Sequence, residues 1–215
     1  MRHLWILLIP LAFAAGFAVC YLWKDRAPEP LETNADATIG FIGCSNTAQS
    51  VMGYHMAGGD DLWQLTDDRK HDFDSGTVRE WANIDNDFWH TFDRYLGAHP
   101  NTRVIWWQLC VPRDDTPTLA DAQKVIAGIK GRIPGVEIYV SALPSYQTGV
   151  CRITGTEGLA RGEELVRELA AQGDVHAGPT LAPHAPEEVL DDGCHLTEKG
   201  MRAVGTQLKQ FFDAL

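Results

Sequence analysis

The segment Thr38–Asn46, which reads TIGFIGCSN, opens the folded part of this chain and indicates its class of fold. Residues 38–43 form a short apolar run with β-branched members, and the sequence Gly-Cys-Ser-Asn closes it. Such a run predicts a buried strand that ends in a tight turn. Ser45 therefore follows directly after a strand, where the backbone holds its hydroxyl in a fixed direction.

Apolar patterns in the rest of the chain predict strands that alternate with helices. We expect strands at 103–111, 136–143 and 175–181, and helices at 78–96, from Thr116-Pro117 to Ile129, at 157–172 and after Thr197. The range 51–74 contains adjacent glycines and several charges, and we place no element there. The alternation predicts an α/β fold in which helices cover both faces of a central parallel sheet. Ligands bind such a sheet beyond the carboxyl ends of its strands, so residues that follow strands are the candidates for chemistry.

Residues 1–23 form a separate hydrophobic element. No charged residue occurs from Leu4 to Trp23. Roughly twenty apolar residues in a helix span the ~30 Å core of a bilayer, which predicts a signal anchor, with a cleaved signal peptide as the alternative. We expect residues 24–36, rich in proline and acids, to form a linker, and residues 37–215 to form one domain. Either alternative places the domain outside the cytoplasm, and an uncleaved segment would anchor it in the membrane.

Composition limits the partners and places the cysteines. The 215-residue chain has a net charge of -11 and only 18 Lys and Arg residues, which excludes nucleic acid, because phosphate binding requires clustered cations. No glycine-rich phosphate loop and no metal-ligand spacing occurs, so we expect no cofactor and no metal. Beyond the first segment the cysteines are Cys44, Cys110, Cys151 and Cys194. In an oxidising compartment they form up to two disulfides, and three connectivities are open.

Ser45 and two residues near the C-terminus form a candidate catalytic triad. Asp192 and His195 lie three positions apart in DDGCH, so the carboxylate can turn back and hold one imidazole nitrogen. A serine acts as a nucleophile when such an imidazole takes its proton. Each motif has an ordinary alternative, because a serine at this place often caps a helix and an Asp-Gly turn often lies at the surface. Together they supply a nucleophile, a base and an orienting acid.

These two motifs resemble those of the SGNH, or GDSL-type, hydrolase family over roughly residues 38–215. That family places its nucleophilic serine just after the first strand and a D-x-x-H motif before the C-terminal helix, as Ser45 and Asp192–His195 do here. The resemblance implies a flavodoxin-like, three-layer α/β/α fold and ester hydrolysis. It also implies an oxyanion hole formed by the backbone amides of Ser45 and of a second-block glycine, for which Gly76 is the best match.

The chain departs from the family pattern at two places. Cys44 stands where the family usually has an aspartate before the serine. The second departure is in the third sequence block of the family, which corresponds to Cys110–Asp114 here. The family has an asparagine in this block whose amide donates to the oxyanion, and this chain has none. A missing donor costs on the order of 3 kcal/mol in the transition state. We expect Arg113, a strong donor at the corresponding place, to replace it, with a solvated loop arginine as the alternative.

The cysteines adjoin the same sequence blocks. Cys44 precedes the nucleophile, Cys110 ends the third-block strand, Cys151 follows the next strand and Cys194 precedes the histidine. We expect disulfides Cys110–Cys151 and Cys44–Cys194, because these pairs would join loops at one end of the sheet. Each bridge would brace the loops of the active site.

The leading hypothesis is a serine ester hydrolase in which His195 is the general base and then the general acid. Export makes an O-acylated surface glycan or a lipid ester a reasonable substrate class, and acyl transfer to an alcohol is a close variant. A non-catalytic domain that binds a surface ligand or protein is the alternative from a different class, and the altered third block favours it. An α/β-hydrolase fits less well, because residues 43–47 lack the second glycine of G-x-S-x-G.

Overall fold

The computed structural model describes residues 34–65, 69–73, 76–146 and 151–215. They belong to one compact unit, Glu32–Leu215. The expected anchor or signal segment 1–23 and most of the expected linker lie outside the described residues. Within these ranges no helix could act as a transmembrane span. The side-chain amide of Asn34 donates to the carbonyls of Asp60 (2.6 Å) and Leu62 (2.7 Å), so the packed unit includes the last residues of the expected linker.

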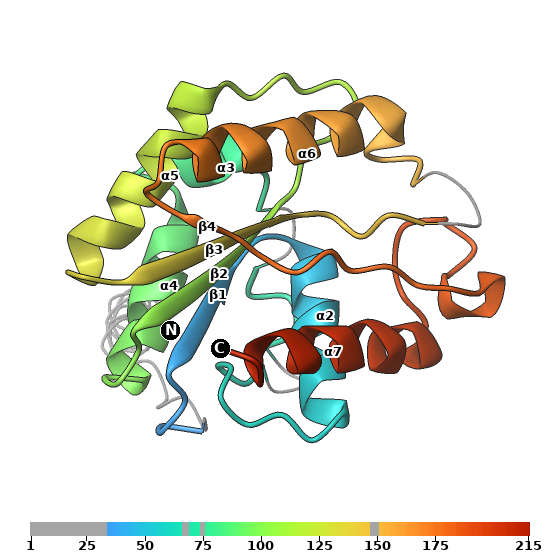
Figure 1. Cartoon of the computed structure of the whole chain (residues 1–215), viewed down its shortest axis with the longest axis horizontal. Helices are drawn as coiled ribbons and strands as arrows, with labels where there is room; N and C mark the ends of the chain where they lie inside the picture. The colour runs from blue at the N-terminus through green and yellow to red at the C-terminus, as the bar shows by residue number, and fades with distance from the viewer. Residues whose placement is uncertain (1–33, 66–68, 74–75, 147–150) are drawn as a thin grey trace, which may run out of the picture. The chain divides into compact units, whose positions relative to one another are not determined.

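A four-stranded parallel sheet forms the centre of the unit (Figure 1). Its strands are β1 (Ile39–Ile42), β2 (Val104–Leu109), β3 (Glu137–Ala142) and β4 (His176–Ala177), in that spatial order. Pairing in β1, β2 and β3 brings Phe41, Trp106 and Tyr139 into register. This sheet with its helices confirms the predicted α/β class and is consistent with three layers. The fourth strand, β4, is much shorter than the strand expected at 175–181, because only His176 and Ala177 pair with β3.

The segment 61–63 pairs with the other edge of β1. The amide of Ile39 donates to the carbonyl of Asp61 (2.9 Å), and the amide of Trp63 donates to the carbonyl of Ile39 (2.9 Å). This parallel pairing lies in the range 51–74, where we expected no element. The chain therefore leaves β1 first towards one side of the sheet and then crosses to β2 on the other side. Such a reversal is a topological switch point, and ligands bind beside it.

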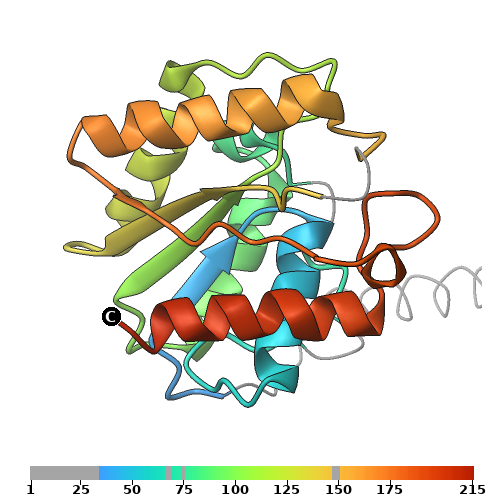
Figure 2. The ribbon, with the colours of Figure 1, turned by 45° about the vertical axis from the view of Figure 1, so that its right-hand side comes forward.

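Helices cover both faces of the sheet. Figures 1 and 2 show α2 and α7 together on one face and α3, α5 and α6 on the other. The helices are α2 (Ser45–Met56), α3 (Val78–Ala82), α4 (Asp87–Ala98), α5 (Leu119–Arg132), α6 (Gly155–Ala171) and α7 (Glu198–Phe212), with a short 3-10 helix at Pro186–Glu188. α4 lies beside α5, where Arg132 pairs with Asp93 at 2.7 Å.

Two helix predictions were wrong in their bounds. The single helix expected at 78–96 is two helices, because the Asn86 side chain accepts from the amide of Phe88 and begins α4. α5 begins after Thr118 rather than at Thr116-Pro117, since the Thr118 hydroxyl accepts from the amide of Asp121 at 3.2 Å. Each correction follows from a side-chain cap, which satisfies a backbone N–H that the first helical turn leaves open.

α2 and α7 pack at very short range through two glycines. A Cβ atom on Gly53 would lie 1.8 Å from the carbonyl oxygen of Met201, and one on Gly205 would lie 1.9 Å from the carbonyl carbon of Gly53. Larger side chains would force the helices apart. The contact therefore fixes α7, and with it the segment that precedes α7, against the helix that begins at Ser45.

Candidate active site

Ser45, His195 and Asp192 form a hydrogen-bonded chain. The Oγ atom of Ser45 lies 2.9 Å from Nε2 of His195, and Nδ1 of His195 lies 2.6 Å from a carboxylate oxygen of Asp192. Ser45 is the first residue of α2 and follows β1 at the switch point, whereas the other two lie on the loop before α7. The structure thus brings together all three residues that the sequence motifs singled out, across 150 positions of the chain.

The turn that presents Ser45 is built for close packing. Gly43 has φ of 155°, and a Cβ there would lie 2.0 Å from Oγ1 of Thr47. The amide of Cys44 donates to this Oγ1 (3.1 Å), and the Thr47 hydroxyl donates to the side-chain oxygen of Gln108 in β2 (2.9 Å). These bonds tie the turn to the centre of the sheet. The nucleophile therefore sits on rigid backbone rather than on a loose loop.

Asp192 orients the histidine through both its carboxylate oxygens. One oxygen accepts from the amides of Cys194 (2.8 Å) and His195 (2.9 Å), and the other faces the imidazole. Partial burial raises the pKa of Asp192, but the hydrogen bonds from His195 and Cys194 outweigh it and lower the pKa to about 2. Asp192 is therefore ionised at neutral pH, and it holds the proton of the imidazole on Nδ1. Nε2 is then free to take the proton of Ser45.

Two further residues of α2 hold the backbone on either side of His195. The Asn46 amide donates to the carbonyl of Cys194 (2.8 Å). The Gln49 side chain accepts from the amide of Leu196 (2.9 Å) and donates to its carbonyl (3.2 Å). Hydrogen bonds from the N-terminal part of α2, which begins at Ser45, thus hold the segment that carries His195. Neither residue was predicted from the sequence, in which their polar character shortly after the serine is the one signal.

Tyr146 adds a third contact to the same segment. Its hydroxyl donates to the carbonyl of Cys194 and accepts from the Asn46 amide (3.0 Å). Burial raises the pKa of Tyr146, so the hydroxyl remains a donor at neutral pH. The carbonyl before His195 therefore has two donors, which restrict its loop from the side of β3.

The backbone around Ser45 provides donors for an oxyanion. As the first residue of α2, Ser45 has an N–H that no carbonyl within the helix accepts, and the helix dipole favours negative charge there. Gly76, the expected second donor, packs against the same turn, because a Cβ on it would lie 2.0 Å from the carbonyl oxygen of Gly43. The indole of Trp81 donates to that carbonyl (3.0 Å) and fixes its direction. Gly76 thus packs against the turn that carries Ser45, and its role as an oxyanion donor stays a prediction.

Arg113 lies elsewhere. Its backbone amide donates to the carbonyl of Ile153 (2.9 Å), and its side chain, 58% exposed, pairs with Asp114 at 3.6 Å. Among the described residues no contact joins its guanidinium to Ser45, Gly76 or His195. The structure therefore favours the solvated loop arginine over the expected oxyanion donor. The reason is that the loop after β2 turns toward the start of α6 rather than across the end of β1.

The disulfide pairing differs from both expected bridges. Cys151 is bonded to Cys194, whereas Cys44 and Cys110 are thiols that pack with Leu143. A hydrogen bond with Cys44, together with burial, raises the pKa of the Cys110 thiol well above its ordinary value. The expected pairs were wrong because Cys44 and Cys110 follow the neighbouring strands β1 and β2 and pack in one buried cluster with Leu143. The observed bridge braces the residue directly before His195.

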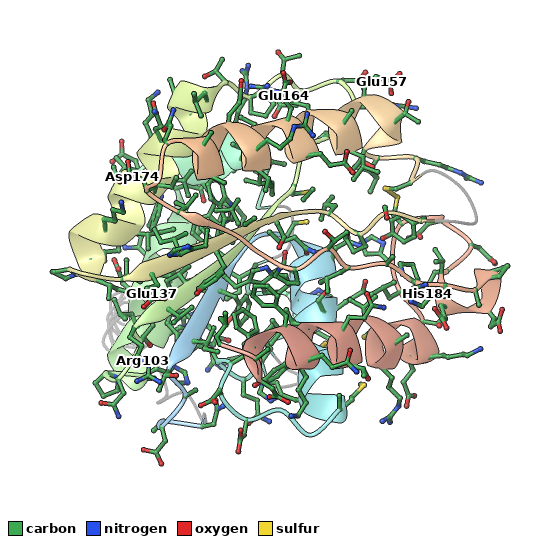
Figure 3. The ribbon with its side chains drawn as sticks, in the orientation of Figure 1. Arg103, Glu137, Glu157, Glu164, Asp174 and His184 are labelled. Carbon is green, nitrogen blue, oxygen red and sulfur yellow. A yellow bond between two sulfur atoms is a disulfide. The ribbon has the colours of Figure 1, made fainter. Side chains whose placement is uncertain are left out.

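Other polar side chains lie away from these residues. His184, labelled in Figure 3, lies on the loop before the short 3-10 helix and contacts Gln207 at 3.3 Å. Glu157 and Glu164 lie on α6, on the opposite side of the sheet from α7 (Figure 3). In the described part of the chain no group of three or more His, Cys, Asp or Glu residues is placed to hold a metal ion.

A cavity of about 420 Å³ opens beside the nucleophile. It is lined by Ser45, Ala48, Gln49, Met52, Lys70, His71, His195 and Met201. Ser45 and His195 thus both line a space that could hold a substrate. No protein-family model matches this chain, and a search of curated proteins finds no significant match.

Proposed function

We propose that this chain is an SGNH-like serine ester hydrolase that acts outside the cytoplasm. The observation that carries the proposal is the chain of hydrogen bonds from Ser45 through His195 to Asp192, with distances of 2.9 and 2.6 Å. These are the distances at which a base takes a proton from a nucleophile and an acid orients the base. The position of the site at a strand end beside the switch point gives further support.

The arrangement of the strands supports a flavodoxin-like fold. When the segment 61–63 is counted as the second strand, the spatial order becomes 2-1-3-4-5, which is the flavodoxin-like order. The sequence motifs of the SGNH family also have fixed places in that fold, with the serine after the first strand and the D-x-x-H motif before the last helix. Ser45 and Asp192–His195 lie at these places. Fold and motifs therefore agree with each other.

Hydrolysis by these residues would proceed through an acyl-enzyme. Ser45 Oγ attacks the ester carbonyl while His195 Nε2 takes its proton, and the backbone amides of Ser45 and Gly76 stabilise the oxyanion. His195 then gives the proton to the leaving alcohol as the ester C–O bond breaks. A water molecule, activated by His195, releases the acid and restores Ser45. An alcohol in place of this water would make the reaction an acyl transfer.

The disulfide supports the proposed location. Cys151–Cys194 is a bridge typical of proteins that fold in an oxidising compartment. Together with the apolar run of residues 1–23, it favours export, with the domain either anchored at the membrane by that run or released after cleavage. The substrate would then be an ester of a surface glycan or a lipid.

A fluorophosphonate probe tests the proposal, since it reacts with an activated serine. We expect the full chain to be labelled once per molecule at Ser45, as located by peptide mass spectrometry. Ser45→Ala should abolish the label, and Ser145→Ala, a serine outside the triad, should keep it. Esterase activity towards p-nitrophenyl acetate should follow the label in all three proteins.

A non-catalytic binding domain is the second candidate. The observation that favours it is Arg113, because its side chain does not supply the oxyanion donor that the third block lacks. Folded protein that takes no label at Ser45 and hydrolyses no ester would support this candidate and contradict the enzyme.

A further inference from the structure

The cavity beside Ser45 has an apolar wall that belongs to two helices. Ser45, Ala48 and Met52 follow one another on α2 at intervals of three and four residues, so they share one face of that helix. Met201 of α7 adds a second methionine to the same wall. The nucleophile therefore stands at the end of an apolar surface.

This surface is kept in place by the packing of its helices. The close contact of Gly53 with Gly205 and with the backbone of Met201 sets the distance between α2 and α7. Met52 and Met201 are both only half-buried, so their side chains still face open space. Methionine side chains are flexible and polarizable, and they adapt to the shape of an apolar ligand.

Other residues that line the cavity are polar. Lys70 and His71 contribute to its lining, and both residues are exposed. A cavity with an apolar wall and a polar rim that includes the cation of Lys70 suits an amphiphile whose chain is buried and whose polar part remains near water. A fully polar substrate such as an acetylated sugar would leave the methionine wall without a partner.

The size of the cavity sets the length of such a chain. A protein cavity of ~150 Å³ holds benzene, with six carbon atoms. At about 420 Å³ this cavity is nearly three times as large. Because it is open to solvent, a chain of about eight to ten carbon atoms fits the apolar part.

We propose that this cavity binds a medium-length hydrocarbon chain of the ester substrate, so that the substrate is a lipid-like ester rather than an O-acetylated glycan. The inference rests on the proposed function, because it assigns the cavity through its position at Ser45 and His195. The chain is attached either to the carbonyl carbon, as an acyl chain, or to the ester oxygen, as an alcohol. Both attachments place the same hydrocarbon against Met52 and Met201.

Two series of esters test the inference on the full-length protein. The first consists of p-nitrophenyl esters with acyl chains of increasing length, and the second consists of acetate esters of alkyl alcohols of increasing length. Each methylene buried adds about fourfold to kcat/KM when burial is complete. With incomplete burial we expect kcat/KM to rise at least ~30-fold from a two-carbon to an eight-carbon chain in one of the series.

Substitutions in the wall show whether the cavity causes this rise. Met52→Trp fills the space and should remove at least ~tenfold of the gain for the eight-carbon ester, with less than ~threefold effect on the shortest ester. Met56→Trp is the matched control, because Met56 lies one turn further along α2 and does not line the cavity. It should leave the chain-length profile unchanged. Met52→Ala enlarges the space and should shift the optimum to longer chains, which keeps the test valid if the tryptophan variant does not fold.

The outcomes separate this inference from the proposed function. A rise in the first series assigns the chain to the acyl group, and a rise in the second assigns it to the alcohol. A flat profile in both series, with labelling of Ser45 and hydrolysis of the two-carbon esters intact, would overturn the inference and leave the hydrolase in place. A rise that is equally strong in Met52→Trp and Met52→Ala would also overturn it. Absence of both labelling and hydrolysis would instead remove the proposed function and the inference with it.

Discussion

Removal of the Cys151–Cys194 disulfide should destabilise the domain more than it impairs catalysis. The bridge closes a loop of 43 residues. The entropy of closing a loop of this length corresponds to about 4 kcal/mol of unfolding free energy. We therefore expect Cys151→Ala/Cys194→Ala to lower the free energy of unfolding by about 4 kcal/mol.

The effect on turnover should be smaller, because hydrogen bonds hold the histidine loop independently of the bridge. Asn46 and Tyr146 still bind the carbonyl of residue 194, and Gln49 still binds both backbone groups of Leu196. A misplacement of 1 Å at a reacting centre costs about 10²-fold in rate. We expect a decrease in kcat well below that value at a temperature where the variant remains folded.

Urea unfolding followed by tryptophan fluorescence measures the change in stability, and reductant provides the control. Dithiothreitol should destabilise the wild-type protein by the same amount as the double substitution and should not affect the double variant. A double variant as stable as the wild type, or one that reductant destabilises further, would refute the assigned pairing and the loop-entropy argument.

Three further predictions concern the catalytic geometry. Gln49→Ala removes two hydrogen bonds to the backbone of Leu196 and should lower the free energy of unfolding by about 2 kcal/mol. In steady-state kinetics the decrease in kcat should be larger than the change in KM. An unchanged kcat contradicts the positioning role. Asp192→Asn should lower kcat by about 10⁴-fold, since the imidazole then loses its orienting charge. The pKa of Asp192 is lowered from 3.8 to about 2 in the folded protein. The stability that the carboxylate contributes should therefore be complete above about pH 4 and disappear as the pH falls to about 2. The unfolding curves of wild type and Asp192→Asn should converge only in that interval. Gly76→Ala would bring a Cβ to 2.0 Å from the carbonyl oxygen of Gly43 and should cost about 1–3 kcal/mol in stability by thermal melting. Because this clash displaces the backbone amide of residue 76, we expect a loss of activity towards all esters. A variant that melts at lower temperature but remains fully active would contradict a role for this amide in the oxyanion hole.

The central strands could be predicted because they are buried on both faces. β2 is apolar except for Gln108, and β3 contains the apolar run 138–140, and such runs differ clearly from the sequence around them. The helix α2 was not predicted, because it buries polar as well as apolar residues. Asn46, Thr47 and Ser50 are all buried in it, and they interrupt the apolar period that normally marks a helix. The strand segment at 61–63 was missed because it is too short to show a pattern.

Local motifs predicted the three residues of the candidate site, because Ser45 follows a recognisable strand and Asp192 and His195 lie three positions apart. The pairing of cysteines, the hydrogen bonds of Asn46 and Gln49 and the outward direction of Arg113 depend on distances between segments far apart in the chain. Sequence spacing contains no such distances, since they arise only when the helices and strands pack. The order of residues therefore specifies which groups are available for chemistry, and packing selects which of them meet.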